Sequence, residues 1–206
     1  MEQDVIIAGG GLNGPALALA LAQAGFHVTL VDARPDGARA AEGFDGRAYA
    51  LALASQRLLA ALGVWPEVAR EATAIEAIRT SDGVPQGASV PFFLSFDRGE
   101  LDEGPMGFLL EDRYLHKALV AAMAAEPKIR RLSGVSVVAQ EAGPEAISVT
   151  LSTGEALSAR LLVGCDGRGS GVAGRAGIRR QGWGYGQTAL VNALQLDAPH
   201  GGGAHQ

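Results

Sequence analysis

A glycine-rich turn between two apolar segments is the feature that most constrains this sequence. Gly9, Gly11 and Gly14 have the spacing G-x-G-x-x-G, and they lie between an apolar run at 4–8 and an Ala- and Leu-rich run at 15–24. The first run predicts a strand buried in a parallel sheet. The second predicts a helix, because Ala and Leu favour helices, proline suits a first turn and glycine a C-terminal cap. Strand, glycine turn and helix in this order predict a βαβ unit that binds a dinucleotide.

Each glycine of the turn has its own expected role. Gly9 permits the tight turn, Gly11 lets the backbone approach a pyrophosphate, and Gly14 lets the helix pack closely on the strand. The start of the helix offers unpaired N–H groups and the positive end of the helix dipole to the phosphates. Valine in place of Gly11 is therefore expected to abolish cofactor binding.

An acid follows the turn at the expected place. Asp32 ends the next predicted strand, at 27–32, where it can accept hydrogen bonds from the ribose 2′- and 3′-hydroxyls. It would repel a 2′-phosphate, so the sequence disfavours NADP at this site. The pattern does not separate NAD from FAD.

A second glycine-acid turn lies in the segment LLVGCDGRGS at 161–170. Asp166 and Gly167 have two interpretations, which stay open. Asp166 accepts hydrogen bonds from cofactor hydroxyls or from backbone amides that must be positioned, or this is a plain Asp-Gly turn whose acid bonds its own backbone. Cys165, at the end of an apolar strand, is expected to be a buried small hydrophobe and not a nucleophile.

Two arginines are candidate cofactor contacts. Arg47 follows Asp45-Gly46, where a cation could reach the pyrophosphate. Arg113 lies in the first turn of a helix expected from Asp112 to about residue 125, where a cation opposes the helix dipole. The alternative for each arginine is a solvated surface residue.

The remaining elements are expected from periodicity and turn residues. Residues 33–44 are predicted as a loop, and a turn is predicted at Gly143-Pro144. The expected helices lie at 55–62 and 66–73, and the expected strands at 75–79, 89–96, 135–139, 147–151, 157–163 and 187–196.

Composition excludes several classes of protein. The net charge is −5 with no basic run, so nucleic acid is not an expected partner. A single cysteine excludes an intrachain disulfide and fits a reducing compartment. Histidines, cysteine and carboxylates do not cluster, so no metal site is predicted. Glycines and a proline interrupt the apolar stretch at 6–24, which argues against a signal peptide or a membrane span.

The order of the motifs DVIIAGGGLNG, LVDAR, DGRAYALALASQRLLAALGVW and LLVGCDGRGSGV resembles the FAD-dependent aromatic hydroxylases of the p-hydroxybenzoate hydroxylase class. Within that class the chain is most similar to ubiquinone-biosynthesis hydroxylases of the UbiH/VisC type. The DGRAYAL block is the most specific part, and GWGYGQTALVNALQLDAPHGGGAHQ also resembles the subgroup. The resemblance covers the whole chain but only about the N-terminal half of a family member, so the chain is expected to be truncated and to bind FAD weakly.

The resemblance implies an α/β fold. A Rossmann-like FAD-binding βαβ domain is expected at 1–73 and 101–180. Part of an interleaved antiparallel substrate-domain sheet is expected at 74–100 and 181–206.

The resemblance also implies a set of cofactor-binding residues. Glycines of the loop hold the FAD pyrophosphate, Asp32 takes the adenosine ribose, and the Asp-Gly motif contacts FAD and is linked to NAD(P)H use. The implied residues are Gly9, Gly11, Leu12, Asn13, Gly14, Asp32, Ala33, Arg34, Arg47, Arg113, Asp166 and Gly167. Ala173 stands where the family usually has arginine, and Arg175 is the candidate replacement.

The implied activity is monooxygenation of a phenolic, prenylated ring in ubiquinone biosynthesis, with FAD as cofactor and NAD(P)H and O2 as co-substrates. No catalytic side chain is assigned, since the flavin carries the chemistry. The expected location is cytoplasmic, and a peripheral contact with the inner membrane or a biosynthetic complex stays open. The alternatives are a non-catalytic FAD-domain fragment and a flavin-dependent reductase or dehydrogenase of the same fold.

Overall fold

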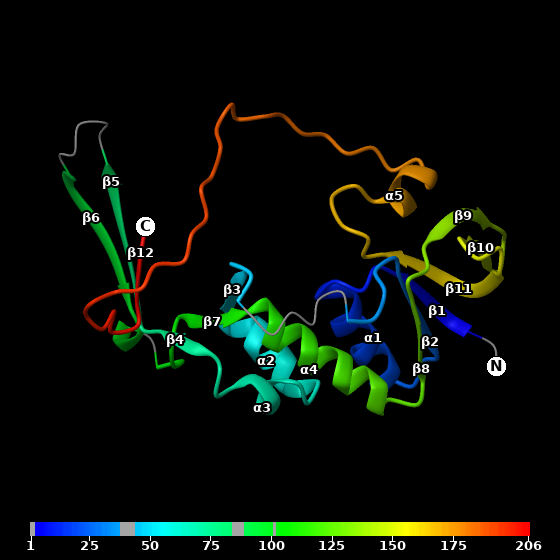
Figure 1. Cartoon of the computed structure of the whole chain (residues 1–206), viewed down its shortest axis with the longest axis horizontal. Helices are drawn as coiled ribbons and strands as arrows, with labels where there is room; N and C mark the ends of the chain where they lie inside the picture. Colours follow the sequence, from blue (N-terminus) through cyan, green and yellow to red (C-terminus); the bar gives the residue numbers. More distant parts are fainter. Residues whose placement is uncertain (1–2, 38–43, 84–88, 101) are drawn as a thin grey trace. The chain divides into compact units, whose positions relative to one another are not determined.

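The structure is a computed structural model that describes residues 3–37, 44–83, 89–100 and 102–206. The chain forms two compact units. The first combines Met1–Gly43 with Leu115–Ala189, and the second combines Phe44–Tyr114 with Leu190–Gln206. Figure 1 shows the elements of both. The expected assignment of 1–73 and 101–180 to FAD binding and of 74–100 and 181–206 to the substrate stays a prediction.

The first unit is built on a six-stranded sheet with the order β8-β2-β1-β11-β10-β9. Strands β8, β2, β1 and β11 run parallel, and β10 and β9 complete the sheet in antiparallel pairs. This arrangement confirms the α/β class. The strands are β1 (Gln3–Ala8), β2 (Val28–Asp32), β8 (Ile129–Ser133), β9 (Val137–Ala142), β10 (Ile147–Leu151) and β11 (Ala156–Gly164).

Helix α1 (Asn13–Gln23) connects β1 to β2 and confirms the predicted βαβ unit. Gly25 has a φ of 105°, which fits its expected role after the helix end. Buried apolar side chains of the strands and of α1 build the core. On the sheet, one buried cluster joins the parallel and antiparallel strands through Ile6, Val31, Val149, Leu151 and Ala159.

The antiparallel end of the sheet also follows the sequence expectation. Strands β9 and β10 form a hairpin, and the amide of Gly143 donates to the carbonyl of Ala146 at 2.8 Å in its turn. The short helix α5 (Gly171–Arg175) follows β11.

The second unit contains two small sheets, β12-β5-β6 and β3-β7-β4. Its helices are α2 and α3, and α4 begins here and continues into the first unit. The elements are β3 (Ala48–Ala52), α2 (Leu53–Ala61), α3 (Trp65–Val68), β4 (Thr73–Ile75), β5 (Ala77–Gly83), β6 (Ser89–Asp97), a 3-10 turn (Arg98–Glu100), β7 (Gly107–Glu111), α4 (Asp112–Ala125) and β12 (Gly203–His205).

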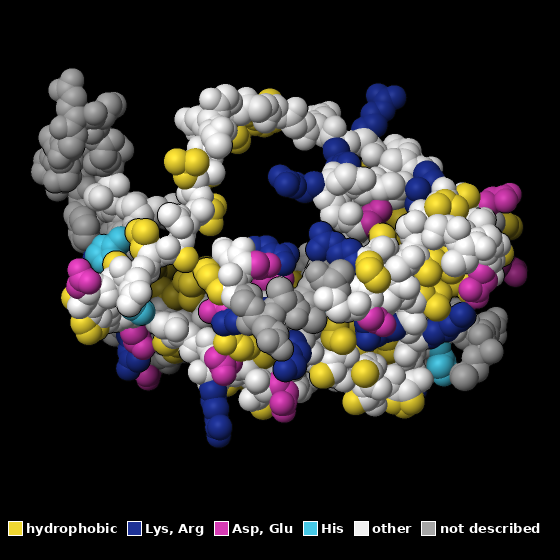
Figure 2. Space-filling view, in the orientation of Figure 1, with side chains coloured by type: hydrophobic (Ala, Val, Ile, Leu, Met, Phe, Trp, Pro, Cys, Tyr) yellow, Lys and Arg dark blue, Asp and Glu magenta, His cyan; other side chains and the backbone are white. Residues whose placement is uncertain are grey.

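Several expected elements differ from the structure. The strand predicted at 75–79 is divided, because β4 ends at Ile75 and β5 begins at Ala77. The strand predicted at 187–196 is wrong, because this segment is irregular and pairs with no strand among the described residues. A strand needs a partner to satisfy its backbone, and here Leu190, Val191 and Leu194 are exposed instead. Figure 2 shows hydrophobic side chains, in yellow, on the surface of this irregular segment. The helix predicted at 66–73 is shorter, since α3 ends at Val68 and Thr73 already begins β4. Of the predicted loop at 33–44, residues 38–43 lie outside the described residues.

Candidate cofactor site

The glycine turn lies at the carboxyl ends of three parallel strands. The amide of Gly9 donates to the carbonyl of Val31 at 2.7 Å, and the amide of Cys165 donates to the carbonyl of Ala8 at 2.7 Å. These bonds bring the ends of β1, β2 and β11 together. Ligands of open α/β sheets bind outside this edge.

Steric space explains why two of the three motif positions need glycine. Gly9 has a φ of 116°, and a Cβ there would overlap the carbonyl oxygen of Cys165. A Cβ at Gly14 would overlap the carbonyl oxygen of Gly9. Gly11 differs, because no atom lies within 4 Å of the place its Cβ would take. Among the three motif glycines, Gly11 therefore faces open space, as expected for the position nearest a ligand.

Gly10 is a close contact of Asp32 that the motif did not single out. A Cβ at Gly10 would overlap the Oδ2 atom of Asp32, so the loop and the acid are in direct contact. The uninterrupted triplet Gly9-Gly10-Gly11 was the available sequence signal. His116 was also missed, although its Nε2 atom lies 3.3 Å from the carbonyl oxygen of Gly10.

The segment after β2 is held against the end of β8. The amide of Gly134 donates to the carbonyl of Arg34 at 2.9 Å, and the amide of Val135 donates to the carbonyl of Asp32 at 3.0 Å. The carboxylate of Asp32 accepts from the amide of Arg34 at 3.3 Å. Ala33 and Arg34 are exposed next to this acid. Strand β8 was not predicted, so this support was missed.

An ion pair between Asp36 and Arg131 also holds this segment against β8. The Asp36 carboxylate accepts from the Ser133 hydroxyl at 2.7 Å and from Arg131 at 2.6 Å. The hydrogen bond from Ser133 and the charge of Arg131 lower the pKa of Asp36. The exposed loop is thereby tied to β8 by side chains as well as by backbone.

The carboxylate of Asp166 is hydrogen-bonded within its own turn. Its Oδ2 atom accepts from the amide of Val172 at 3.1 Å, while Ser170 caps α5 by accepting from the amide of Ala173 at 3.0 Å. Gly167 has a φ of 86°, which favours glycine. Burial raises the pKa of Asp166, but hydrogen bonds from Ser170 and Val172 outweigh it, so the pKa lies below its ordinary value.

Cys165 is partly buried beside this acid. Burial, and then the charge of Asp166, raise the pKa of its thiol. A raised pKa keeps the group protonated, and only the thiolate is a nucleophile. The raised pKa agrees with the expectation that Cys165 is not a nucleophile, although its side chain is only partly buried.

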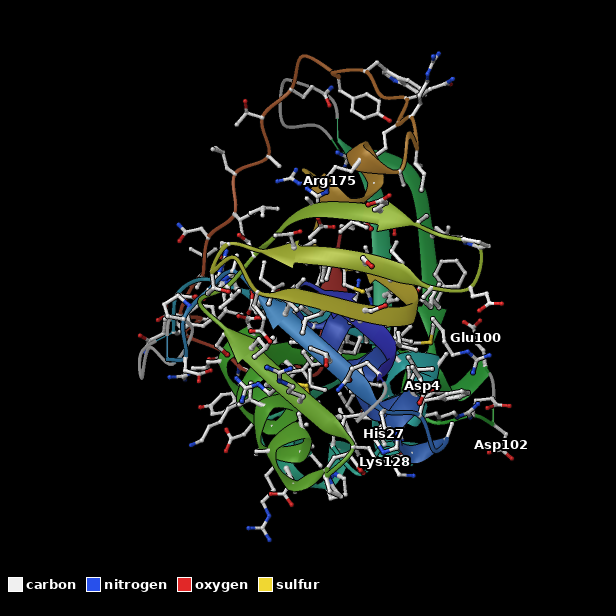
Figure 3. The ribbon with its side chains drawn as sticks, turned by 90° about the vertical axis from the view of Figure 1, so that its right-hand side faces the viewer. Asp4, His27, Glu100, Asp102, Lys128 and Arg175 are labelled. Atoms are coloured by element: carbon white, nitrogen blue, oxygen red, sulfur yellow. The ribbon has the colours of Figure 1, made fainter. Side chains whose placement is uncertain are left out.

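Arg175 is hydrogen-bonded to strand β9 of the sheet. Its Nε atom donates to Gln140 at 3.2 Å and its Nη2 atom donates to the carbonyl of Val137 at 3.1 Å. Gln140 in turn donates to the carbonyl of Val172 at 3.1 Å. Figure 3 shows Arg175 on α5 next to the strands of the hairpin. These contacts hold α5 on β9, which is a structural role and gives no support to Arg175 as the replacement for Ala173.

Arg47 and Arg113 belong to the second unit. Arg47 donates to Asp45 at 2.9 Å and lies 3.4 Å from a carboxylate oxygen of the buried Asp112. Arg113 donates to Glu111 at 2.6 Å, and its guanidinium carbon lies 4.6 Å from the centre of the Tyr114 ring. The structure thus brings together the glycine loop, Asp32 and the Asp166 turn, whereas the two arginines have local partners in the other unit.

The second unit has a cavity of about 350 Å³. Its lining is mainly apolar, with three ionisable side chains from Glu71, Glu111 and His200. The apolar side chains that line it include Phe44, Ile75, Leu109 and Leu110.

The residues of the first unit fit the diphosphate and ribose of FAD. Within the described residues, the amides of Gly11, Leu12 and Asn13 donate to no protein acceptor, and α1 carries no side-chain cap. Amides at a helix N-terminus bind anions. The free space at Gly11 leaves room for a phosphate, and Asp32 supplies an acceptor at the adjacent strand end.

The family model of the FAD binding domain matches residues 2–200. The chain therefore belongs to the FAD-binding domain family, and FAD is its cofactor.

Two curated relatives are ubiquinone-pathway hydroxylases. The chain is 40% identical over 199 residues to the ubiquinone hydroxylase UbiL of Rhodospirillum rubrum, covering 97% of this chain and 45% of the relative. It is 34% identical over 195 residues to the 3-demethoxyubiquinol 3-hydroxylase of Escherichia coli, covering 94% and 49%. The chain thus spans about half the length of these relatives. Both matches confirm the resemblance drawn from the motifs.

A solved structure shares the fold. The protein PqsL of Pseudomonas aeruginosa superimposes with a TM-score of 0.71, at 24% identity, over 88% of this chain and 47% of that one. Separately, no helix within the described ranges is both long enough and apolar enough to span a bilayer.

Proposed function

We propose that the full-length protein is an FAD-dependent monooxygenase that hydroxylates a prenylated phenolic ring in ubiquinone biosynthesis. NAD(P)H and O2 are its co-substrates, and the products are the hydroxylated ring, NAD(P)⁺ and water. The observation that carries the proposal is the contact of the glycine loop with Asp32 at the carboxyl edge of the sheet, in a chain 40% identical to a ubiquinone hydroxylase.

Each part of the first unit has a binding task in this proposal. The amides of Gly11, Leu12 and Asn13 bind the pyrophosphate, and Gly9 and Gly14 fix the turn that presents them.

The resemblance predicts further cofactor contacts. Asp32 accepts from the adenosine ribose, with Ala33 and Arg34 beside it. Asp166 and Gly167 keep the neighbouring turn in place. Arg47 and Arg113 are assigned to the pyrophosphate and flavin sides, respectively.

The bound flavin supplies the redox chemistry, and the protein supplies orientation and electrostatics. The mainly apolar cavity of the second unit is a candidate for the aromatic ring, because most of its lining is apolar and an apolar ring gains by leaving water. A cytoplasmic location with a peripheral contact at the inner membrane would suit a prenylated substrate.

The first experiment is a titration of the purified 206-residue chain with FAD, followed by competition with ADP. We expect weak FAD binding that ADP displaces, because the loop contacts the ADP half of the cofactor. The absence of both would refute the proposed site. Tight stoichiometric FAD would instead contradict the expectation that much of the cofactor shell lies outside this chain.

The second experiment distinguishes the reaction types in the full-length protein. A prenylated phenol is incubated with NAD(P)H and ¹⁸O2, and the product is analysed by mass spectrometry. Incorporation of one ¹⁸O atom supports monooxygenation. Oxidation or reduction without ¹⁸O supports the reductase or dehydrogenase, and FAD binding without NAD(P)H consumption supports a non-catalytic FAD domain.

A further inference from the structure

A histidine from a distant part of the chain contacts the glycine loop. His116 lies on α4, within the same compact unit as the loop, and its Nε2 atom is 3.3 Å from the carbonyl oxygen of Gly10. The side chain is partly buried. Since a carbonyl oxygen only accepts, the Nε2 atom carries the proton and donates it.

The peptide group between Gly10 and Gly11 has unusually little steric restraint of its own. Neither residue has a Cβ, and glycine samples both signs of φ with similar ease. The hydrogen bond to Val31 does not hold this peptide group, because it comes from the amide of Gly9. Among the described residues, the amide of Gly11 has no protein acceptor. The orientation of this peptide group therefore depends on what holds the Gly10 carbonyl.

Fixing the Gly10 carbonyl also fixes the direction of the Gly11 N–H, which is a hydrogen-bond donor. The peptide group is planar, and the described chain contains no cis peptide bond. In a trans peptide the C=O and the following N–H point to opposite sides, so a Gly10 carbonyl directed at His116 turns the Gly11 N–H away from α4. The position of the absent Cβ of Gly11 is open, which leaves a ligand free to approach that residue.

We propose that His116 is a positioning residue for the pyrophosphate site. By donating to Gly10 it fixes the peptide plane that presents the Gly11 N–H to a phosphate oxygen. This inference rests on the proposed role of the loop in FAD binding. It adds a residue outside the G-x-G-x-x-G motif, and it assigns a function to the contact between α4 and the loop.

The test compares three variants of the full 206-residue chain. His116→Phe keeps a planar ring but has no N–H, whereas His116→Gln restores a side-chain N–H donor. Lys117→Gln changes the next, exposed residue of α4 and serves as the matched control. The affinities for FAD and for ADP are measured by titration calorimetry, and the thermal unfolding midpoint of each variant is measured without ligand.

We expect His116→Phe to weaken both ligands about two- to tenfold, the worth of one hydrogen bond, with an unchanged unfolding midpoint. His116→Gln should recover at least half of the lost affinity on a logarithmic scale, and Lys117→Gln should lose less than His116→Phe. ADP must respond as FAD does, because it retains the pyrophosphate but lacks the flavin.

Several results would overturn the inference. Equal affinity of wild type and His116→Phe refutes it while leaving the proposed function intact. A loss that His116→Gln fails to recover shows a structural role only, as does a lower unfolding midpoint in both His116→Phe and His116→Leu. If Phe destabilises the chain, His116→Leu replaces it under the same criteria. A wild-type chain that binds neither FAD nor ADP refutes the proposed cofactor site on which this inference rests.

Discussion

Replacing Gly11 with valine separates cofactor binding from folding. No atom lies within 4 Å of the position that the new Cβ would take, and the φ of Gly11 lies outside the left-handed region. The variant is therefore expected to fold. Its free energy of unfolding should stay within about 1 kcal/mol of the wild-type value, because glycine replacement at a compatible position changes mainly the entropy of the unfolded chain.

The effect on binding is expected to be much larger. The isopropyl group would occupy the space through which a phosphate approaches the loop. It would thereby remove the hydrogen bond from the Gly11 amide, and a bond to a charged group contributes about 1.5–3 kcal/mol. Since about 1.4 kcal/mol corresponds to a tenfold change in Kd, we expect FAD affinity to fall at least about tenfold.

The assay pairs a flavin-fluorescence titration with urea unfolding for each variant. Gly182→Ala is the matched control, because its added Cβ also meets open space but lies outside the loop. The control should keep wild-type affinity. The reasoning fails if Gly11→Val binds FAD as the wild type does. It also fails if the loss of affinity is explained by a lower free energy of unfolding.

Three further predictions follow from the same site. Gly14→Ala should lower the free energy of unfolding by about 1–3 kcal/mol in urea titrations, because the new Cβ overlaps the carbonyl of Gly9 and the backbone must shift; unchanged stability would contradict this packing. Asp166 has a lowered pKa in the folded state, so its stabilising effect is present above the unfolded pKa and is lost as pH falls through the folded one. Asp166→Asn should therefore destabilise the chain at pH 7 but much less at strongly acidic pH, and a pH-independent difference in urea unfolding would refute this. The raised pKa of Cys165 predicts slower alkylation by iodoacetamide in native than in unfolded protein at pH 7, measured by mass spectrometry; equal rates would contradict it.

Local sequence signals predicted the parts of the fold that depend on neighbouring residues. The β1–turn–α1–β2 unit follows from apolar runs, a glycine turn and a glycine after the helix, all within 32 residues. Strand β3 was missed because its sequence, AYALA, consists mostly of helix-favouring residues. Strand β8 was missed because IRRLS carries two arginines, and it forms because β2 provides a partner along its whole length.

The predicted strand at 187–196 shows the opposite case. A segment forms a strand only with a partner that completes the backbone hydrogen bonds. None of the described strands provides one to this segment. Its exposed apolar side chains, Leu190 and Val191 among them, are the signal that local propensity had no matching tertiary contact.

The site likewise contains residues that local sequence signals predict and contacts that they do not. Gly9, Gly14 and Asp32 were predictable from spacing, because each has a role within one βαβ unit. The contact of Gly10 with His116 joins residues that are 106 positions apart in the sequence, so spacing alone carries no information about it.

The geometry also bears on the two interpretations of Asp166. A carboxylate with a lowered pKa is ionised at neutral pH and would repel a pyrophosphate placed beside it. Its oxygen accepts from the amide of Val172, six residues ahead, so the carboxylate is stabilised within the turn itself. The backbone of this turn lies so close to Gly9 that a Cβ there would come within 2.8 Å of the Asp166 amide nitrogen. The acid is therefore best placed to stabilise the turn that lies against the glycine loop. An Asp166→Asn variant should lower the free energy of unfolding more than it lowers the affinity for ADP.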